Sequence, residues 1–209
     1  MKKLSLLLAF FMTLTLCFAS CGAKVDNTQF TPGVLDNNVY TSEWLGLSFT
    51  PTEEIELADP VELEYLMNPP ENAYYTDEVT GEEKLDYSKL GTVYDMLATN
   101  IGTSSSALIM AKYADAEMTV ESYLESLKAG IESQLASESE LGDIVYSESK
   151  SVKLAGEKYR TFEYSVNAGE MTLRQTMYIR KAGDRIANIC FTYSSAAELE
   201  SFLNCFKAN

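Results

Sequence analysis

Four β-rich runs separated by short, glycine-containing gaps make up the last third of the chain, and this feature constrains the fold most strongly. The runs lie near residues 143–153, 158–166, 171–180 and 185–193. Gaps this short can join only neighbouring antiparallel strands, because a parallel pair needs a crossover of about a dozen residues or more. Apolar side chains alternate along the last three runs, as in half-buried strands. The sequence therefore predicts a C-terminal four-strand antiparallel meander.

Two amphipathic helices are predicted to cover this meander and two further strands near residues 92–99 and 105–113. The stronger helix runs from about Thr119 to Leu135, with apolar residues at three- and four-residue spacing and Thr119 as its N-cap. A closing helix is expected from about Ser195. Its apolar stripe consists of Leu199, Phe202, Leu203 and Phe206. We therefore expect an α+β fold, in which an antiparallel sheet of about six strands is covered by helices.

The middle of the chain is less regular. A run at Val39–Ser42 precedes a turn and a strand in which Leu45, Leu47 and Phe49 alternate. Residues 51–54 have the features of a helix start, and residues 60–67 form a short helical turn that Asn68-Pro69-Pro70 stops. Residues 69–91 mix acids with tyrosines, and we expect an acidic, tyrosine-rich surface insertion with a hairpin around residues 79–82.

The N-terminus has the pattern of an export signal. Two lysines are followed by an apolar segment, Leu4–Phe18, and by Ala19-Ser20-Cys21. This resembles a bacterial lipoprotein signal, in which the cysteine is acylated with diacylglycerol and the chain is cut before it. Phe18 stands where that family usually carries Leu. Ordinary signal cleavage and a retained helix are the alternatives, but fifteen residues span only about 22 Å of the roughly 30 Å hydrocarbon core.

This resemblance implies a division of the chain and a location. Residues 1–20 are expected to be removed, 21–38 to form a flexible tether, and 39–209 to form the folded domain. The acylated Cys21 would hold the protein on the extracytoplasmic face of the cell membrane. Gly22 after the cysteine favours a Gram-positive envelope, and in a Gram-negative cell the domain would be periplasmic.

Charge and composition exclude several function classes. The chain has 31 acidic and 16 basic side chains, a net charge of −15, and loss of residues 1–20 makes this −17. Nucleic acid is excluded as a partner, because phosphate contacts need Lys and Arg. The chain contains no histidine, which excludes Ser-His-Asp catalysis and histidine-ligated zinc. No glycine-rich phosphate loop is recognisable, and we expect no cofactor and no metal.

A few residues are candidates for a specific role. Cys190 and Cys205 can form a disulfide in an exported protein, or they can be two small buried hydrophobes. Gln175 and Asn188 interrupt apolar runs. Their side chains have three possible environments: a cavity, hydrogen bonds within the sheet, or water. The acidic segment 53–86 either binds Ca²⁺ or is a solvated loop, and it lacks the spacing of an EF-hand.

Aromatic side chains mark a candidate partner surface. This surface would consist of Trp44, Tyr74, Tyr75 and Tyr87. Amphipathic rings are common at protein interfaces. The alternative is that these rings fold down over the edge of the sheet.

The order of the elements resembles the PsbP/Mog1-like fold. The likeness rests on three segments: residues 40–49 followed by Pro51, the helix opening at 118–124, and Val152–Tyr159 leading into the late strands. It covers about residues 39–207, and the insertion at 69–91 departs from it. The resemblance implies a sandwich and a non-catalytic accessory module, since PsbP supports a membrane complex and Mog1 binds a small GTPase.

These expectations favour a lipid-anchored binding or accessory protein of the bacterial envelope, with a protein partner and without enzymatic activity. Two alternatives remain open at this stage. A small-ligand-binding lipoprotein needs an enclosed cavity between sheet and helix, and a carboxylate-dependent envelope hydrolase needs a deep pocket with converging acids.

Overall fold

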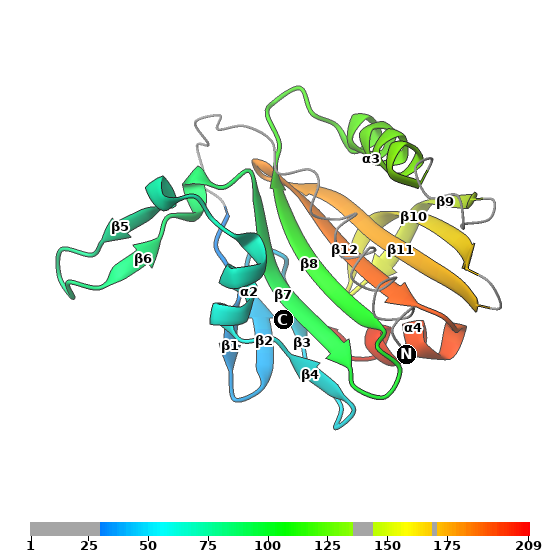
Figure 1. Cartoon of the computed structure of the whole chain (residues 1–209), viewed down its shortest axis with the longest axis horizontal. Helices are drawn as coiled ribbons and strands as arrows, with labels where there is room; N and C mark the ends of the chain where they lie inside the picture. The colour runs from blue at the N-terminus through cyan, green and yellow to red at the C-terminus, as the bar shows by residue number, and fades with distance from the viewer. Residues whose placement is uncertain (1–29, 136–143, 169–170) are drawn as a thin grey trace.

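The computed structural model describes residues 30–135, 144–168 and 171–209, and it confirms an α+β fold built on antiparallel strands (Figure 1). Seven strands form the main sheet, and every neighbouring pair in it is antiparallel. In spatial order the strands are β4 (Ile55–Leu57), β7 (Thr92–Asn100), β8 (Ser106–Tyr113), β12 (Arg185–Tyr193), β11 (Met171–Ala182), β10 (Glu157–Ala168) and β9 (Ile144–Leu154). The predicted C-terminal meander is confirmed, because β9 to β12 pair in chain order.

A second, smaller sheet was not predicted. It contains β1 (Val34–Asp36), β2 (Val39–Ser42), β3 (Leu47–Phe49) and β13 (Phe206–Ala208), in that order. The pairing of β13 with β3 joins the end of the chain to its first half. In this pair, the ring centroids of Phe49 and Phe206 lie 4.9 Å apart. The small sheet therefore depends on contacts between residues far apart in the sequence.

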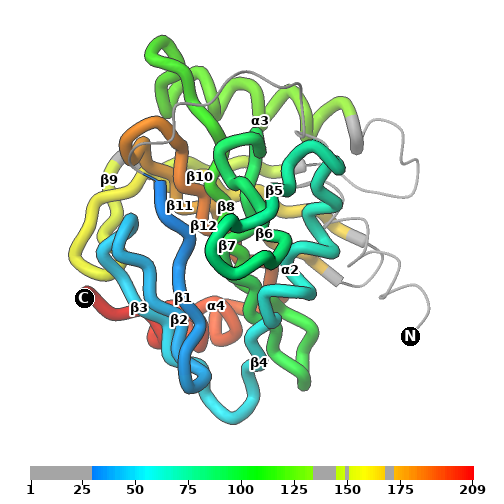
Figure 2. Tube along the Cα trace, turned by 90° about the vertical axis from the view of Figure 1, so that its left-hand side faces the viewer, coloured from blue at the N-terminus to red at the C-terminus, as the bar shows by residue number. Residues whose placement is uncertain are grey.

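The two faces of the main sheet are covered by different elements (Figure 2). α3 (Val120–Leu135) and α2 (Pro60–Met67) pack on one face, where Tyr123, Leu124 and Leu127 meet the side chains of β10, β11 and β12. The small sheet and α4 (Ala196–Leu203) cover the other face, with Phe49 and Phe202 buried against it. The result is a three-layer domain with one core on each side of the main sheet.

Two elements differ from the sequence prediction. Residues 51–54 form a turn that leads into β4 rather than a helix, because Ile55 pairs with Asn100 at the end of β7 and is buried. The closing helix begins as predicted, with Ser195 accepting a hydrogen bond from Glu198 N, but it ends at Leu203. Phe206 therefore belongs to β13 rather than to the helical stripe, since its backbone pairs with β3.

The domain begins earlier than predicted. Residues 30–38 belong to the range expected as a tether, yet β1 lies within them and Phe30 is buried. The expected boundary at residue 39 therefore lies at residue 30 or earlier. The remainder of that range falls outside the described residues.

The segment 69–91, for which an acidic insertion with a hairpin was predicted, forms an arm that contains a hairpin (Figure 1). β5 (Tyr74–Thr76) and β6 (Glu83–Leu85) pair as an antiparallel hairpin between two short 3₁₀ turns, η1 (Glu71–Ala73) and η2 (Tyr87–Lys89). The hairpin extends away from the body of the domain, and Val79 near its tip is 94% exposed.

The contact of α4 with the main sheet gives a stability prediction. Phe202 is completely buried against β12, so Phe202→Ala removes a ring from a filled core and is expected to lower the free energy of unfolding by about 3–5 kcal/mol. Val79→Ala is the control, with an expected change of at most about 0.5 kcal/mol. Urea unfolding followed by circular dichroism measures both, and equal midpoints would contradict this packing.

Candidate functional site

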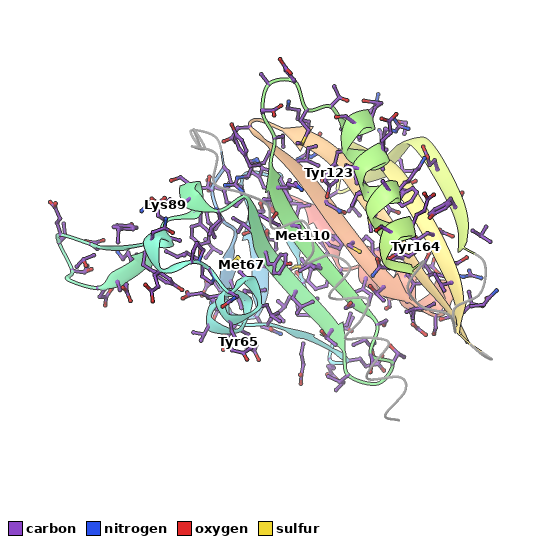
Figure 3. The ribbon with its side chains drawn as sticks, turned by 45° about the horizontal axis from the view of Figure 1, so that its top comes forward. Tyr65, Met67, Lys89, Met110, Tyr123 and Tyr164 are labelled. Carbon is purple, nitrogen blue, oxygen red and sulfur yellow. The ribbon has the colours of Figure 1, made fainter. Side chains whose placement is uncertain are left out.

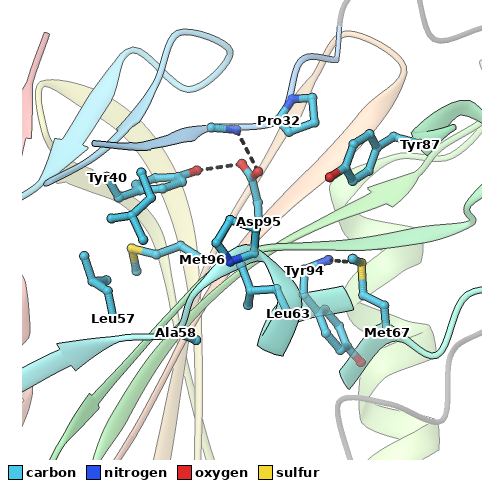
Figure 4. A pocket seen from close by; sticks show the side chains of 13 residues that line it. Pro32, Tyr40, Leu57, Ala58, Leu63, Met67, Tyr87, Tyr94, Asp95 and Met96 are labelled. Atoms are coloured by element: carbon cyan, nitrogen blue, oxygen red, sulfur yellow. Dashed lines mark hydrogen bonds between the residues drawn. The ribbon is translucent and has the colours of Figure 1, made fainter. Parts of the chain in front are cut away.

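The main candidate site is a pocket at the β7 edge of the main sheet, which we call the edge pocket (Figure 4). β4 pairs only with the last residues of β7, so the first half of β7 lacks a neighbouring strand on that side. α2 and the segment before β2 approach this free edge instead. The edge pocket has a volume of about 60 Å³. Its walls include Tyr40, Leu63, Met67, Tyr87, Tyr94 and Asp95.

A β-bulge positions Asp95, the one acid among the described residues that line the edge pocket. Tyr94 pairs with Met110 and Met96 with Ile109, so Asp95 is an extra residue without a partner on β8. As a result Tyr94 faces the α3 side of the sheet and Met96 the small-sheet side, although they are two residues apart. Bulges often redirect side chains next to functional sites.

Asp95 is a buried carboxylate held by neutral donors. Its residue is 6% exposed, Tyr40 OH donates to Oδ2 at 2.6 Å, and Gly33 N–H donates to Oδ1 at 2.8 Å. Burial raises the pKa of Asp95, although both hydrogen bonds and the charge of Arg185 act in the opposite direction. Burial and the neighbouring carboxylate raise the pKa of Tyr40 well above its usual value, so its phenol remains a donor.

The approach of residue 33 to Tyr40 requires glycine. A Cβ atom at position 33 would lie 2.2–2.6 Å from atoms of the Tyr40 ring, closer than real contacts allow. The absence of a side chain lets the backbone N–H of Gly33 reach the carboxylate of Asp95. This hydrogen bond holds the segment before β2 against the edge pocket.

Arg185 stabilises the same region through hydrogen bonds to backbone carbonyls of β8 and η2. It is fully buried, its Nη1 donates to Ala111 O at 3.0 Å, and its Nη2 donates to Tyr87 O at 2.9 Å. The guanidinium carbon lies 4.5 Å from the centre of the Phe30 ring, a cation–π contact. Burial lowers the pKa of Arg185 to about 10, so it stays charged at neutral pH.

A second, smaller cavity lies under α3, among the side chains seen in Figure 3. Gln175 and Asn188 both line it, which settles where these two polar residues point. Tyr164 OH donates to Gln175 Oε1 at 2.7 Å, and Asn188 Nδ2 donates to Tyr123 OH at 3.2 Å. Its volume of about 20 Å³ has room for about one water molecule. This cavity has a mainly apolar lining with a few polar groups, and it is too small for a metabolite.

A third feature is an open groove beside α2, which we call the α2 groove. Its volume is about 530 Å³, and its residues are Glu56, Leu57, Ala58, Val61, Glu62, Tyr65, Leu66, Leu97 and Thr99. Tyr65 and Val61 lie one helical turn apart and are 84% and 75% exposed, respectively. Figure 3 labels Tyr65 on this helix. Sequence reasoning missed the pair, although two apolar residues four apart in a short helix were a signal.

The four predicted aromatic residues do not form one surface. Trp44 packs edge-on against Phe30 and donates from Nε1 to Ala182 O at 3.2 Å, and Tyr87 lies against the core and the edge pocket. Tyr74 OH donates to Glu64 on α2 at 2.7 Å. Tyr75 alone among them is largely exposed, at 48%. The folded-down alternative thus describes Trp44 and Tyr87 best.

The disulfide left open between Cys190 and Cys205 is not formed. Both thiols are free and buried. Cys190 belongs to the core under α3 and Cys205 to the core under the small sheet, so the main sheet separates them. Burial raises the pKa of Cys190 to about 12, so it acts as a small hydrophobe rather than a nucleophile. Cys21 lies outside the described residues, and none of the described helices is long and apolar enough to cross a bilayer.

In the acidic loop of the hairpin, the carboxylate of Asp77 stabilises the turn. Asp77 accepts hydrogen bonds from Val79 N–H and Thr80 N–H and pairs with Lys84, contacts that lower the pKa of Asp77 to about 2. Over residues 30–135, 144–168 and 171–209, no three acidic, cysteine or histidine side chains gather as a metal site would require. Asp95 is the one acid among the described residues of the edge pocket, which therefore does not show the pair of carboxylates that glycosidases use.

Comparisons with known proteins give similar folds and no family. No family model and no curated protein matches the chain. A solution structure of cyanobacterial PsbP from Synechocystis sp. PCC 6803 is similar over 92% of this chain and 99% of its own, with 10% identity and a TM-score of 0.44. A crystal structure from Bacteroides thetaiotaomicron is similar over 82% of this chain and 48% of its own, with 12% identity and a TM-score of 0.39. Likenesses this distant assign no activity to the chain.

The buried carboxylate gives a pH prediction. Because burial raises the pKa of folded Asp95, the folded state binds more protons than the unfolded state, and this contribution to stability is lost as the pH rises through that pKa. The free energy of unfolding of the wild type, relative to Asp95→Asn, should therefore be largest below about pH 4 and decrease toward neutral pH. Urea unfolding at several pH values measures the difference.

Asp36→Asn is the control. This substitution also removes one negative charge, but Asp36 is an exposed residue of β1 and does not line the edge pocket. A wild-type advantage over Asp95→Asn that grows with pH would show that the hydrogen bonds from Tyr40 and Gly33 outweigh the burial of Asp95.

Proposed function

We propose that this chain is a lipid-anchored accessory protein on the extracytoplasmic face of a bacterial membrane. We favour a Gram-positive cell as its source, and we propose that it binds a protein partner through the α2 groove. The observation that carries this proposal is the exposed pair Val61 and Tyr65 beside an apolar depression. Aromatic side chains at the centre of an apolar patch with a polar rim are typical of interfaces. The groove is open, which suits a macromolecular segment better than a small enclosed ligand.

Charge defines the partner further. Residues 53–86 contain twelve of the 31 acids of the chain and one basic residue, Lys84, so this segment, which includes α2 and the hairpin, is strongly acidic. Glu56 and Glu62 stand at the rim of the α2 groove. A partner segment that places an apolar side chain in the groove and Lys or Arg at its rim is complementary in both respects. The same charge disfavours direct contact of this surface with anionic lipid head groups.

The two alternative functions have less support. A small-ligand-binding protein needs an enclosed cavity of some hundreds of Å³, whereas the edge pocket and the cavity under α3 measure about 60 and 20 Å³. A carboxylate-dependent hydrolase needs two acids that converge, whereas Asp95 is the one acid that lines the edge pocket. We therefore propose a non-catalytic role.

The partner surface is testable by site-specific photo-crosslinking in the native organism. Benzoylphenylalanine in place of Tyr65 is expected to give one dominant cross-linked protein. The matched control places the same group at Val145, which is 62% exposed on β9. Adding Glu56→Lys should reduce the yield from position 65 several-fold, because it reverses a rim charge. Equal products from both positions, or none from position 65, would disprove this surface.

The anchor is tested by membrane fractionation and mass spectrometry. Cys21→Ser should move the protein from the membrane to the soluble or secreted fraction and remove the acyl mass, because the thiol is the expected attachment point. Cys17→Ser is the control and should leave the protein on the membrane. Membrane retention of the Cys21→Ser protein would contradict lipid anchoring.

A further inference from the structure

The carboxylate of Asp95 feels the charge of Arg185 but makes no close ion pair within the part of the chain that the structure describes. Among the described residues no Lys or Arg forms an ion pair with it, and its two hydrogen bonds come from a phenol and a backbone amide. The side chain of Arg185 donates instead to the carbonyls of Ala111 and Tyr87. Buried carboxylates are usually paired, since neutral donors recover only part of the lost hydration. Each carboxylate oxygen also has acceptor capacity beyond its one hydrogen bond.

The space beside this carboxylate has a defined size and lining. The edge pocket measures about 60 Å³, and one water needs about 10–15 Å³, so a group of only a few heavy atoms fits. Tyr87 and Tyr94 supply aromatic rings, and Leu63 and Met67 supply apolar surface (Figure 4). Aromatic rings attract cations through their faces. A small cation with an apolar stem matches both the charge and the lining.

Other cations fit less well. Ca²⁺ requires six or more oxygen ligands, and the edge pocket offers one carboxylate and phenol oxygens. A guanidinium group is a planar fork that favours two free, coplanar carboxylate oxygens, whereas both oxygens of Asp95 already accept hydrogen bonds. A primary ammonium is compact, donates three hydrogen bonds and needs no fixed plane.

We propose that the edge pocket binds a primary ammonium group, with Asp95 as its counter-charge and Tyr87 and Tyr94 as its aromatic walls. The ammonium belongs either to a small free amine or to a lysine side chain. The edge pocket and the α2 groove share Leu57 and Ala58, so a lysine of a bound protein segment lies within reach. Binding strengthens as the pH rises and Asp95 ionises, up to the pKa of the amine near about 10.4.

Methylammonium chloride is the probe for the free amine. Added at millimolar concentrations, it is expected to raise the thermal midpoint of the wild-type protein in a saturable manner, whereas sodium chloride of equal ionic strength and the neutral analogue methanol are not. Asp95→Asn should weaken the apparent affinity at least about tenfold. Identical curves for methylammonium and sodium chloride, or an unchanged affinity in Asp95→Asn, would overturn the proposal.

A second pair of variants serves if Asp95→Asn is unstable. Tyr87→Leu keeps the backbone carbonyl that Arg185 uses and removes one aromatic wall, so the affinity should fall about two- to fivefold. Tyr75→Leu removes an exposed tyrosine outside the edge pocket and should leave the affinity unchanged. Equal affinities in these two variants would overturn the role of the aromatic walls.

The two sources of the ammonium are separated by a lysine probe. Nα-acetyl-lysinamide carries a free side-chain ammonium, and its Nε-acetylated form is the neutral control. Saturable binding of the first and not of the second supports a lysine ligand, and binding of methylammonium alone supports a free amine. Binding of neither amine disproves the ammonium site while leaving the α2 groove untouched, because that groove is tested by cross-linking at position 65.

Discussion

The central strands of the main sheet are buried on both faces, and most of the remaining structure follows from this constraint. β12 is buried at all nine of its positions, whereas a sheet with one wet face would alternate. The chain must therefore supply two coverings. α3 and α2 provide one, and the small sheet with α4 provides the other. The second covering combines β1 to β3 with β13, so segments far apart in the sequence are parts of the same layer.

The edge pocket lies where these two coverings meet around β7. A bulge of one residue changes which side chains face each layer, and it places Asp95 between α2 and the segment before β2. An apolar residue there would fill the space without the cost of a buried charge. Retention of a carboxylate at a bulge is a local departure from the most stable arrangement, and such departures concentrate at functional sites.

Long periodic elements were predictable, and short ones were not. β10 to β12 and α3 were predicted because their side chains display a clear period, and the short gaps between the last four strands fix the pairing of β9 to β12. β4, β1 and β13 contain three residues each, too few for a period, and they are defined by partners distant in the sequence. Phe206 shows the limit, since it continues a helical stripe yet pairs with β3. Asp95 did carry a signal, as one acid within the apolar run Val93–Leu97, but convergence with Tyr40 and Gly33 required the fold.

Phe30 is the first described residue of the domain, and its burial determines where the segment that leads to the proposed anchor is held. Eight residues lie between Cys21 and Phe30, and the nine chain steps that join them reach at most about 30 Å. Tension from a lipid at Cys21 would act first on the Phe30 ring, which packs against Trp44 and under the guanidinium of Arg185. It would reach Gly33 and Asp95 only after that contact yields. If Cys21 carries the proposed lipid, the buried Phe30 ring would keep tension on the anchor from reaching the edge pocket.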